Sequence, residues 1–294
     1  MNIKSKDGIV TIEGIRDFNT DHIFDCGQCF RWQRNDDSSY TGMAYGKPVR
    51  ISYDEDAESI AIVNCDEADV SNIWRKYLDL DRDYSKIKDE LSGKDSVIAN
   101  AISYGSGIRI LNQEKWETMI SFIISQNNNI PRIKGCIHAL ARALGEFVGE
   151  FDGKEWFKLP SPEALAEATE EDLAPCKLGY RSKYLLSLSK KVTKDGLGSL
   201  DAMASPELTS DETVAKLCEY DGIGPKVANC IALFAMGKIS SFPVDVWVKR
   251  VMHELYGLEE KPRIIKAFAD EHFGEWGGIA QQYLFYYITH RNKD

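Results

Sequence analysis

The chain lacks any long apolar run, and no stretch approaches the roughly 18 consecutive apolar residues of a membrane helix. Its first residues, MNIKSKDGIV, lack the apolar segment of a secretion signal. Internal repeats and low-complexity segments are also absent. We therefore expect a protein that is not secreted, contacts no membrane and resides in the cytoplasm. Hydrophobic residues make up 43% of the 294 positions, which predicts a packed core rather than disorder.

The cysteines give little support for a metal site or for disulfides. Seven cysteines, an odd number, are spread from Cys26 to Cys230, which suits reduced thiols in a cytosolic protein. Cys26 and Cys29 form the only close pair, and a redox or zinc role stays open for them. No second Cys or His pair completes a zinc site, however. The sequence therefore predicts no metal and no cofactor.

The charge of the chain is unevenly distributed. A net charge of −10 argues against indiscriminate adhesion to nucleic acid. Between Asp221 and Arg250, however, four side chains are basic and two are acidic. The acidic clusters lie elsewhere, at residues 54–56, 66–67 and 170–172, and we expect them on solvated outer faces.

Turn and periodicity signals divide the chain near Gly105-Ser106-Gly107. Alternating apolar residues and turns before this point predict an antiparallel meander. The expected strands are 9–12, 29–33, 40–45, 49–53 and 59–63. The expected helices of this half are 70–80, 84–92 and 95–104. Beyond Gly107, helical periodicity predominates, with segments at 115–125 and from Pro225 to about Met236. The prediction is an α+β protein with a β-rich domain over residues 1–105 and a helical region of two packed lobes over 106–294.

Residues 213–250 contain two expected helices separated by a glycine turn. Apolar residues recur at helical spacing up to Cys218, and Asp221-Gly222-Ile223-Gly224 then interrupts the pattern. Pro225 suits the first position of the second helix. The two glycines permit a tight turn and leave bare amide N–H groups beside a helix N-terminus, which is a ready anion site. The arrangement resembles a helix-hairpin-helix module that grips a DNA phosphate, although an ordinary helix corner would also explain Gly222 and Gly224.

Two charged residues make this segment unusual. Lys226 is expected as the second residue of the second helix, where the helix dipole disfavours a cation. A solvated lysine would explain this position, but so would an amine kept neutral and nucleophilic. Asp245 follows in Phe242-Pro243-Val244-Asp245-Val246, just before an amphipathic run, so helix capping would also explain it.

Gly222-x-Gly224-x-Lys226 followed by Pro243-Val244-Asp245 is a specific combination. It resembles the helix-hairpin-helix, Gly-Pro-Asp superfamily of base-excision DNA glycosylases. The resemblance implies that Lys226 and Asp245 are the catalytic pair of a bifunctional member, which cuts the glycosidic bond and then the strand. Because Cys230 is the last cysteine, the chain excludes the four-cysteine iron–sulfur loop that some members carry.

A second run, Gly27-Gln28-Cys29-Phe30-Arg31-Trp32, resembles the 8-oxoguanine DNA glycosylases. This resemblance covers nearly the whole chain and implies that the β-rich domain is like the TATA-binding protein. Guanine N7 is an acceptor, and oxidation at C8 puts a proton on N7 and makes it a donor. The backbone carbonyl of Gly27 would therefore attract the lesion and repel normal guanine. A plain β-turn would also explain the glycine.

The same resemblance assigns residues to an extruded base. The expected base-binding set is Gly27, Gln28, Cys230, Gln281 and Phe285. Cys230 shares a helix face with Lys226 and would pack against one side of the base. Gln281 would bond to its Watson–Crick edge, and Phe285 would stack on the other side. Core packing is the alternative explanation of both Cys230 and Phe285.

The expected DNA-binding set is Asn127, Arg132, Tyr180, Arg181, Gly222, Gly224 and Lys249. Asn127 begins a run of three asparagines and would fill the gap left by the extruded base, although capping also favours asparagines. Arg132 and Arg181 would contact the orphaned cytosine, and Tyr180 would act as a wedge beside it. A solvent-facing arginine is the alternative for Arg132, and a common type of helix start is the alternative for Tyr180-Arg181.

The hairpin amides and Lys249 would hold phosphates. Trp247 stands where the animal enzymes tend to have a histidine that contacts phosphate. An indole donates one hydrogen bond but carries no charge, so that phosphate contact is in question for this chain.

We predict a bifunctional 8-oxoguanine DNA glycosylase and AP lyase that acts on damaged double-stranded DNA as a monomer. The chemistry needs no cofactor, and a structural cation at the hairpin stays open. The nearer alternative is a glycosylase for another oxidised base, against which the Gly27 and Phe285 context argues. The farther alternative is a non-catalytic helix-hairpin-helix DNA-binding protein, which would need neither Lys226 nor Asp245.

Overall fold

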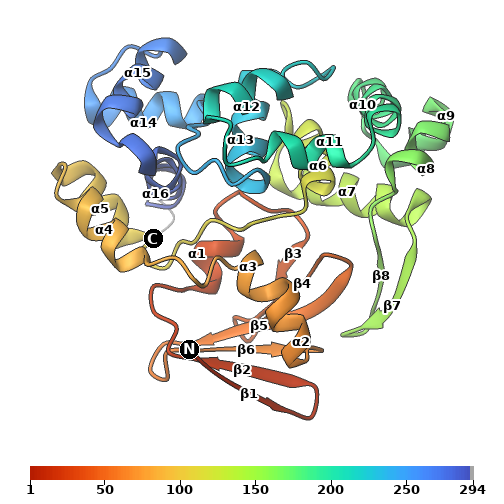
Figure 1. Ribbon diagram of the computed structural model, residues 1–294, viewed down its shortest axis with the longest axis horizontal. Helices are drawn as coiled ribbons and strands as arrows, with labels where there is room; N and C mark the ends of the chain where they lie inside the picture. Colours follow the sequence, from red (N-terminus) through yellow and green to blue (C-terminus); the bar gives the residue numbers. More distant parts are fainter. Residues whose placement is uncertain (292–294) are drawn as a thin grey trace.

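A six-stranded antiparallel sheet forms one side of the molecule, and most helices gather on the other side (Figure 1). The computed structural model describes residues 1–291. The strands lie in the order β1-β2-β6-β5-β4-β3. Their bounds are β1 Asn2–Lys6, β2 Ile9–Glu13, β3 Trp32–Arg34, β4 Tyr40–Ala44, β5 Lys47–Asp54 and β6 Ser59–Val63.

The sheet is formed because apolar residues alternate along its central strands and share one face. Val10 pairs with Ile62 and Ile12 pairs with Ile60, and all four side chains are fully buried. Short helices cover this face, among them α1 (Thr20–Phe24), α2 (Glu67–Asp69), the π-helical segment η1 (Val70–Trp74) and α3 (Arg75–Tyr77). The sheet and these helices enclose a hydrophobic core of their own.

The remaining helices share a second, larger core. They are α4 Tyr84–Ser92, α5 Ser96–Tyr104, α6 Lys115–Ser125, α7 Ile130–Leu144, α8 Pro162–Glu167, α9 Glu170–Leu173, η2 Ala174–Cys176, α10 Arg181–Asp195, α11 Gly198–Met203, α12 Ser210–Leu217, α13 Pro225–Ala235, α14 Val246–Tyr256, α15 Pro262–His272, η3 Gly274–Trp276 and α16 Gly277–His290. Helix α5 packs against α16 in this part, and α4 packs against α5 (Figure 1). Over residues 1–291, no helix combines the length and the apolar character that a membrane crossing requires.

Several predicted elements are confirmed, and their ends follow local chemistry. Helix α6 spans the predicted residues, and α13 begins at Pro225 and ends one residue before Met236. The helix expected at 70–80 is wrong in its bounds, because a capping box between Asp66 and Asp69 starts it at Glu67. The strand expected at 29–33 is also wrong in its start. Pairing begins only at Trp32, because Phe30 turns away to pack against Phe122.

A hairpin of two strands, β7 (Phe147–Phe151) and β8 (Lys154–Phe157), interrupts the helical part, where helical periodicity was expected to predominate. Its tip contacts the main sheet. The Asp152 carboxylate accepts a hydrogen bond from Thr41 Oγ1 at 2.8 Å and pairs with Arg50 at 3.3 Å. These contacts come from a part of the chain about a hundred residues away, so local periodicity does not report them.

The start of α6 joins the helical part to the sheet through two half-buried carboxylates. Glu114 accepts a hydrogen bond from the backbone N–H of Tyr45 at 3.0 Å. Glu117 pairs with Arg31 at 3.2 Å. Burial, with the neighbouring Glu117 carboxylate as a second cause, raises the pKa of Glu114 to about 7. This junction matters for function because α6 ends at the asparagine run.

Replacing Glu114 by glutamine is expected to stabilise the protein above neutral pH. Because the pKa of Glu114 is raised on folding, the folded state binds more protons between about pH 4.5 and 7, and the free energy of unfolding falls as pH rises through that window. Glu114→Gln keeps an acceptor for the Tyr45 N–H and removes this loss. We expect a gain of about 2–3 kcal/mol at pH 8 and little change at pH 4.5, measured by denaturant unfolding. An equal effect at both pH values would contradict the assignment.

Candidate active site

One cavity of about 850 Å³ opens between the glycine hairpin, the asparagine run, the Gly27 turn and α16. It collects most of the predicted site residues. Nine of them line it, namely Gly27, Asn127, Tyr180, Gly224, Lys226, Cys230, Asp245, Gln281 and Phe285. The other five predicted residues do not line it, namely Gln28, Arg132, Arg181, Gly222 and Lys249. Residues far apart in the sequence thus meet around one space large enough for a base.

The hairpin between α12 and α13 has the backbone that its glycines predict. Gly222 has a φ of +81°, and a Cβ there would lie 2.4 Å from the Tyr184 ring, so only glycine fits. Gly224 is the residue before α13, and a Cβ there would meet no protein atom within 4 Å. The fold itself therefore requires glycine at position 222, because a side chain there would clash with Tyr184. Gly224 is exposed and leaves open space at the N-terminus of α13.

Lys226 is the second residue of α13, as predicted, and its side chain is half-buried. Its ammonium lies over the Phe122 ring, 5.7 Å from the ring centroid. Cys230 lies one turn along the same helix, close enough for Lys226 to influence its thiol. Burial raises the pKa of that thiol, and the nearby Lys226 opposes the rise. The lysine is thus held against apolar and weakly polar neighbours rather than extended into solvent.

Asp245 precedes α14 and faces the same cavity. One carboxylate oxygen, Oδ1, accepts a hydrogen bond from Val248 N at 2.8 Å, which confirms the capping role. Capping leaves the other oxygen available, since a carboxylate has several acceptor positions. Asp245 lies close enough to Cys230 to influence its titration, as Lys226 does. The lysine and the aspartate therefore line the same cavity and act electrostatically on the same thiol.

The Gly27 turn approaches α16 closely. Gly27 has a φ of +78°, and a Cβ on it would lie 3.2 Å from Cε1 of Phe285. The Gln28 side chain points away from the cavity and is fully buried. Its amide nitrogen donates to the backbone carbonyls of Ile23 and Arg109, both at 2.9 Å, and its Oε1 accepts from Leu111 N. Gln28 thus anchors the turn, and its side chain has no exposed group for a base.

Two glutamines and Phe285 form the α16 side of the cavity. Gln281 and Gln282 are both almost fully buried, and Gln282 Nε2 donates to Gln281 Oε1 at 3.0 Å. The Oε1 atom of Gln282 is buried and has no hydrogen-bond partner within the described chain. Buried polar atoms without partners are uncommon and need an explanation. A polar ligand in the cavity would provide one.

Two residues of the asparagine run bond at helix ends, and the first faces the cavity. Asn128 Nδ2 donates to Ile124 O at 3.0 Å, at the end of α6, and Asn129 caps α7 by accepting from Arg132 N at 3.0 Å. Asn127 does neither of these. It has a φ of +49°, is exposed and lines the cavity. Capping therefore accounts for two of the three asparagines and not for the first.

Arg181 is buried, and its guanidinium holds the backbone of the asparagine run. Nε donates to Gln126 O at 2.9 Å, and Nη2 donates to Asn127 O at 3.0 Å and also to Gln126 O. Nη1 donates to Leu178 O at 3.1 Å. These four bonds leave one of the five guanidinium N–H groups for another partner. Arg181 thus lies on the side of the loop away from the cavity, where it fixes the backbone of residues 126–127.

Arg132 and Lys249 lie outside the cavity. Arg132 is exposed near the start of α7, where Nη2 approaches Lys177 O at 3.4 Å, and Lys249 is half-buried on α14.

The rim of the cavity is unusually apolar for a surface. Of the large hydrophobic side chains that are exposed among residues 1–291, four line this cavity: Ile130, Tyr180, Val246 and Trp247.

Gln126, which no sequence motif singled out, connects these parts. Gln126 Nε2 donates to Gly222 O at 2.8 Å, so the residue before the asparagines bonds to the glycine hairpin. Its carbonyl is also the main acceptor for Arg181. The only signal in the sequence is its position directly before Asn127. The loop, the hairpin and the start of α10 are thus one hydrogen-bonded unit.

The helical part of the chain matches a known class. The family of HhH-GPD superfamily base excision DNA repair proteins matches residues 120–273. The N-terminal domain of 8-oxoguanine DNA glycosylases matches residues 11–119. Fold and site thus define a helix-hairpin-helix protein of base-excision repair. The chain belongs to the 8-oxoguanine DNA glycosylase and AP lyase family within that superfamily.

Individual relatives agree with this placement. The N-glycosylase/DNA lyase OGG1 of Arabidopsis thaliana is 30% identical over 275 residues, which is 89% of this chain and 75% of the relative. The N-glycosylase/DNA lyase of Saccharomyces cerevisiae is 30% identical over 83% of this chain and 70% of the relative. The 8-oxoguanine glycosylase/lyase of Clostridium acetobutylicum, solved with double-stranded DNA containing cytosine opposite 8-oxoguanine, is 40% identical, covers 99% of both chains and has a TM-score of 0.93.

Proposed function

We propose that this protein excises 8-oxoguanine from duplex DNA and then cuts the strand, with Lys226 as nucleophile and Asp245 as the assisting carboxylate. The observation that carries the proposal is the shared cavity, in which both residues lie beside the predicted base-binding groups Gly27, Gln281 and Phe285. A pure DNA-binding module would need neither charged residue there. We place the protein wherever the cell's DNA lies, and one chain supplies every proposed group, so a monomer suffices.

Recognition follows from the polarity of N7. The Gly27 carbonyl accepts the N7 proton that only the oxidised base carries, and it repels the N7 lone pair of normal guanine. The base lies between the Phe285 ring and the Cys230 side of α13. Gln281 and the unpartnered oxygen of Gln282 offer amide groups to the base edge. Because these amides are buried, a base that leaves one of them without a hydrogen-bond partner binds with a less favourable free energy.

The DNA contacts are proposed around the cavity mouth. Exposed Asn127, with its left-handed backbone, enters the gap left by the extruded base, and exposed Tyr180 acts as the wedge. Arg132 is the proposed contact to the orphaned cytosine. Arg181 supports Asn127 from behind and keeps one N–H for the same cytosine. The open space at Gly224, with Gly222 shaping the turn and Lys249 nearby, accommodates a phosphate at the N-terminus of α13.

Chemistry at C1′ needs the base outside the stack, which is why extrusion precedes it. Neutral Lys226 Nζ attacks C1′, and the bond from C1′ to the base breaks with its electrons on 8-oxoguanine. The Asp245 carboxylate stabilises the developing oxocarbenium charge and accepts a proton from the amine. Opening of the sugar ring gives a Schiff base on Lys226. Loss of a C2′ proton then expels the 3′ phosphate and cuts the strand.

Replacing Gly27 by alanine is expected to impair base recognition selectively. The new Cβ would lie 3.2 Å from Phe285 on a backbone with a φ of +78°, so both the carbonyl and the ring must shift. We expect 8-oxoguanine release to fall by roughly tenfold or more, while cleavage at a preformed abasic site stays within about threefold. Gly153→Ala is the matched control, since Gly153 has a φ of +70° with no atom near its Cβ. An equal fall in 8-oxoguanine release and in abasic-site cleavage would contradict the recognition role of Gly27.

A panel of lesion duplexes tests the substrate. Duplexes carrying 8-oxoguanine opposite cytosine, an oxidised pyrimidine or an alkylated purine are compared by single-turnover base release. The proposal predicts fastest release of 8-oxoguanine. Faster release of an oxidised pyrimidine would favour the nearer alternative, a glycosylase for another oxidised base.

A further inference from the structure

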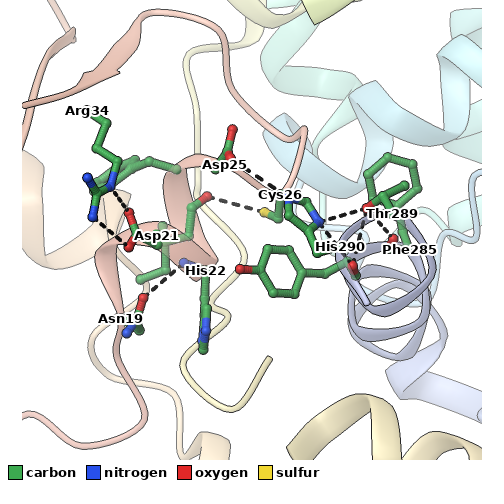
Figure 2. Close-up of polar contacts among 12 residues, drawn as sticks. Asn19, Asp21, His22, Asp25, Cys26, Arg34, Phe285, Thr289 and His290 are labelled. Atoms are coloured by element: carbon green, nitrogen blue, oxygen red, sulfur yellow. Dashed lines mark hydrogen bonds and ion pairs between the residues drawn. The ribbon is translucent and has the colours of Figure 1, made fainter. Parts of the chain in front are cut away.

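The last turn of α16 holds the short helix and turn that lead into Gly27. His290 Nε2 lies 3.7 Å from the Asp25 carboxylate, two residues before Gly27. Figure 2 shows this contact, with Cys26 next to Asp25. The other ring nitrogen of His290, Nδ1, lies 3.1 Å from Tyr286 O and 2.9 Å from Thr289 Oγ1. The imidazole therefore bonds to its own helix on one side and faces the Asp25 carboxylate on the other.

Contacts among three aromatic rings extend the same connection. The Tyr286 ring lies 4.2 Å from the His290 ring and 5.2 Å from the ring of His22, which belongs to α1. His22 Nδ1 in turn accepts a hydrogen bond from Gly107 N at 3.1 Å. Burial lowers the pKa of His22, which favours the neutral ring that this acceptor role requires. We call His22, Asp25, Tyr286 and His290 the α16 tether.

The tether and the base-binding slot are parts of the same two segments. Phe285 is adjacent to Tyr286 on α16, and Gly27 follows Asp25 two residues later in the turn. Thr289 Oγ1 donates to Phe285 O at 2.7 Å and links the ring's backbone to the His290 turn (Figure 2). The contact between Asp25 and His290 and the close approach of Gly27 to Phe285 therefore join the same two segments.

We propose that the α16 tether is a positioning device for lesion recognition, which sets the spacing and direction of the Gly27 carbonyl relative to Phe285. This inference rests on the proposed function, because it assigns the tether to base recognition and not to the lysine chemistry. A single carbonyl separates the lesion from guanine only if its direction is fixed, since hydrogen bonds weaken steeply off axis. Lys226 and Asp245 lie on α13 and at the start of α14, so the tether does not hold them.

The partial exposure of the Asp25 and His290 side chains distinguishes a role in recognition from a role in general stability. The Asp25 side chain is 53% exposed and that of His290 15%. Ion pairs of this kind contribute little to folding, so the fold is expected to tolerate their loss. A spacing error of a fraction of an ångström at Gly27, in contrast, acts directly on discrimination.

The experiment compares His290→Ala and Asp25→Asn with His138→Ala, which removes an exposed histidine on α7. Three quantities are measured: single-turnover release of 8-oxoguanine opposite cytosine, strand cleavage at a preformed abasic site, and the binding ratio between the lesion duplex and an undamaged duplex. The binding ratio is measured with Lys226→Gln as the common background. His290→Phe is included as a conservative variant that keeps the stack on Tyr286 but loses the ion pair.

We expect His290→Ala to lower the binding ratio and base release by roughly tenfold and Asp25→Asn by about threefold, with abasic-site cleavage within about twofold of wild type. His290→Phe should recover part of the loss, and His138→Ala should change nothing. An unchanged binding ratio in both variants, or an equal fall in all three quantities, would overturn the tether. Failure of the wild-type protein to release 8-oxoguanine would overturn the proposed function instead.

Discussion

Replacing Lys226 by glutamine is expected to abolish base release and strand cleavage, with a fall of at least about a thousandfold, while lesion binding stays within about threefold of wild type. Glutamine keeps most of the side-chain length that contacts Phe122 and Cys230 but has no nucleophilic amine. Single-turnover kinetics on a duplex with 8-oxoguanine opposite cytosine, together with a binding titration, measure both quantities.

Lys216→Gln is the matched control for the loss of a lysine in the same motif. Lys216 is exposed on α12 and lines a separate hollow of the surface, not the cavity. The Lys216→Gln variant should retain full activity. Full activity of Lys226→Gln would remove the lysine from the mechanism, and a collapse of binding in that variant would indicate a role in the DNA contact instead.

Replacing Asp245 by asparagine is expected to slow base release by roughly a hundredfold to a thousandfold, with little change in binding. Asparagine caps a helix about as well as aspartate, so the hydrogen bond to Val248 N can persist. The substitution therefore separates the carboxylate charge from the cap. We expect the free energy of unfolding to change by no more than about 1 kcal/mol, measured alongside the single-turnover rate.

Asp83→Asn gives the corresponding control at a capping aspartate outside the site. Asp83 caps α4 by accepting from Lys86 N at 3.1 Å, and it is exposed. Its replacement should leave the rate unchanged. If Asp245→Asn loses stability in proportion to activity, the residue acts as a cap and not as the assisting carboxylate.

The helices of the site were predictable because their ends depend on local chemistry. Pro225 and the glycine turn define α13, and the run of asparagines marks the boundary between α6 and α7. Strand β1 and the β7–β8 hairpin were not predicted. Strand β1 is short, polar and mostly exposed, and it exists because it pairs with β2. The hairpin depends on contacts of Asp152 with a distant part of the sheet.

The positions of the site residues were partly predictable, and their orientations were not. The glycine hairpin, Lys226, Asp245 and Phe285 meet in one cavity, as their motifs imply. Gln28 and Arg181 belong to equally specific motifs, yet both side chains are turned to backbone groups, which occupy the Gln28 amide and four of the five N–H groups of Arg181. A sequence gives the residue type at each position. Whether a polar side chain faces a ligand or supports a loop depends on which backbone groups the fold leaves unpaired.

Borohydride trapping is the most direct test of the central claim, a Schiff base on Lys226. The protein is mixed with a duplex containing one 8-oxoguanine opposite cytosine, reductant is added, and the covalent product is digested to locate the modified residue. We predict a protein–DNA adduct on Lys226 that is absent from Lys226→Gln. Release of free 8-oxoguanine without any adduct, or an adduct on another residue, would contradict the account.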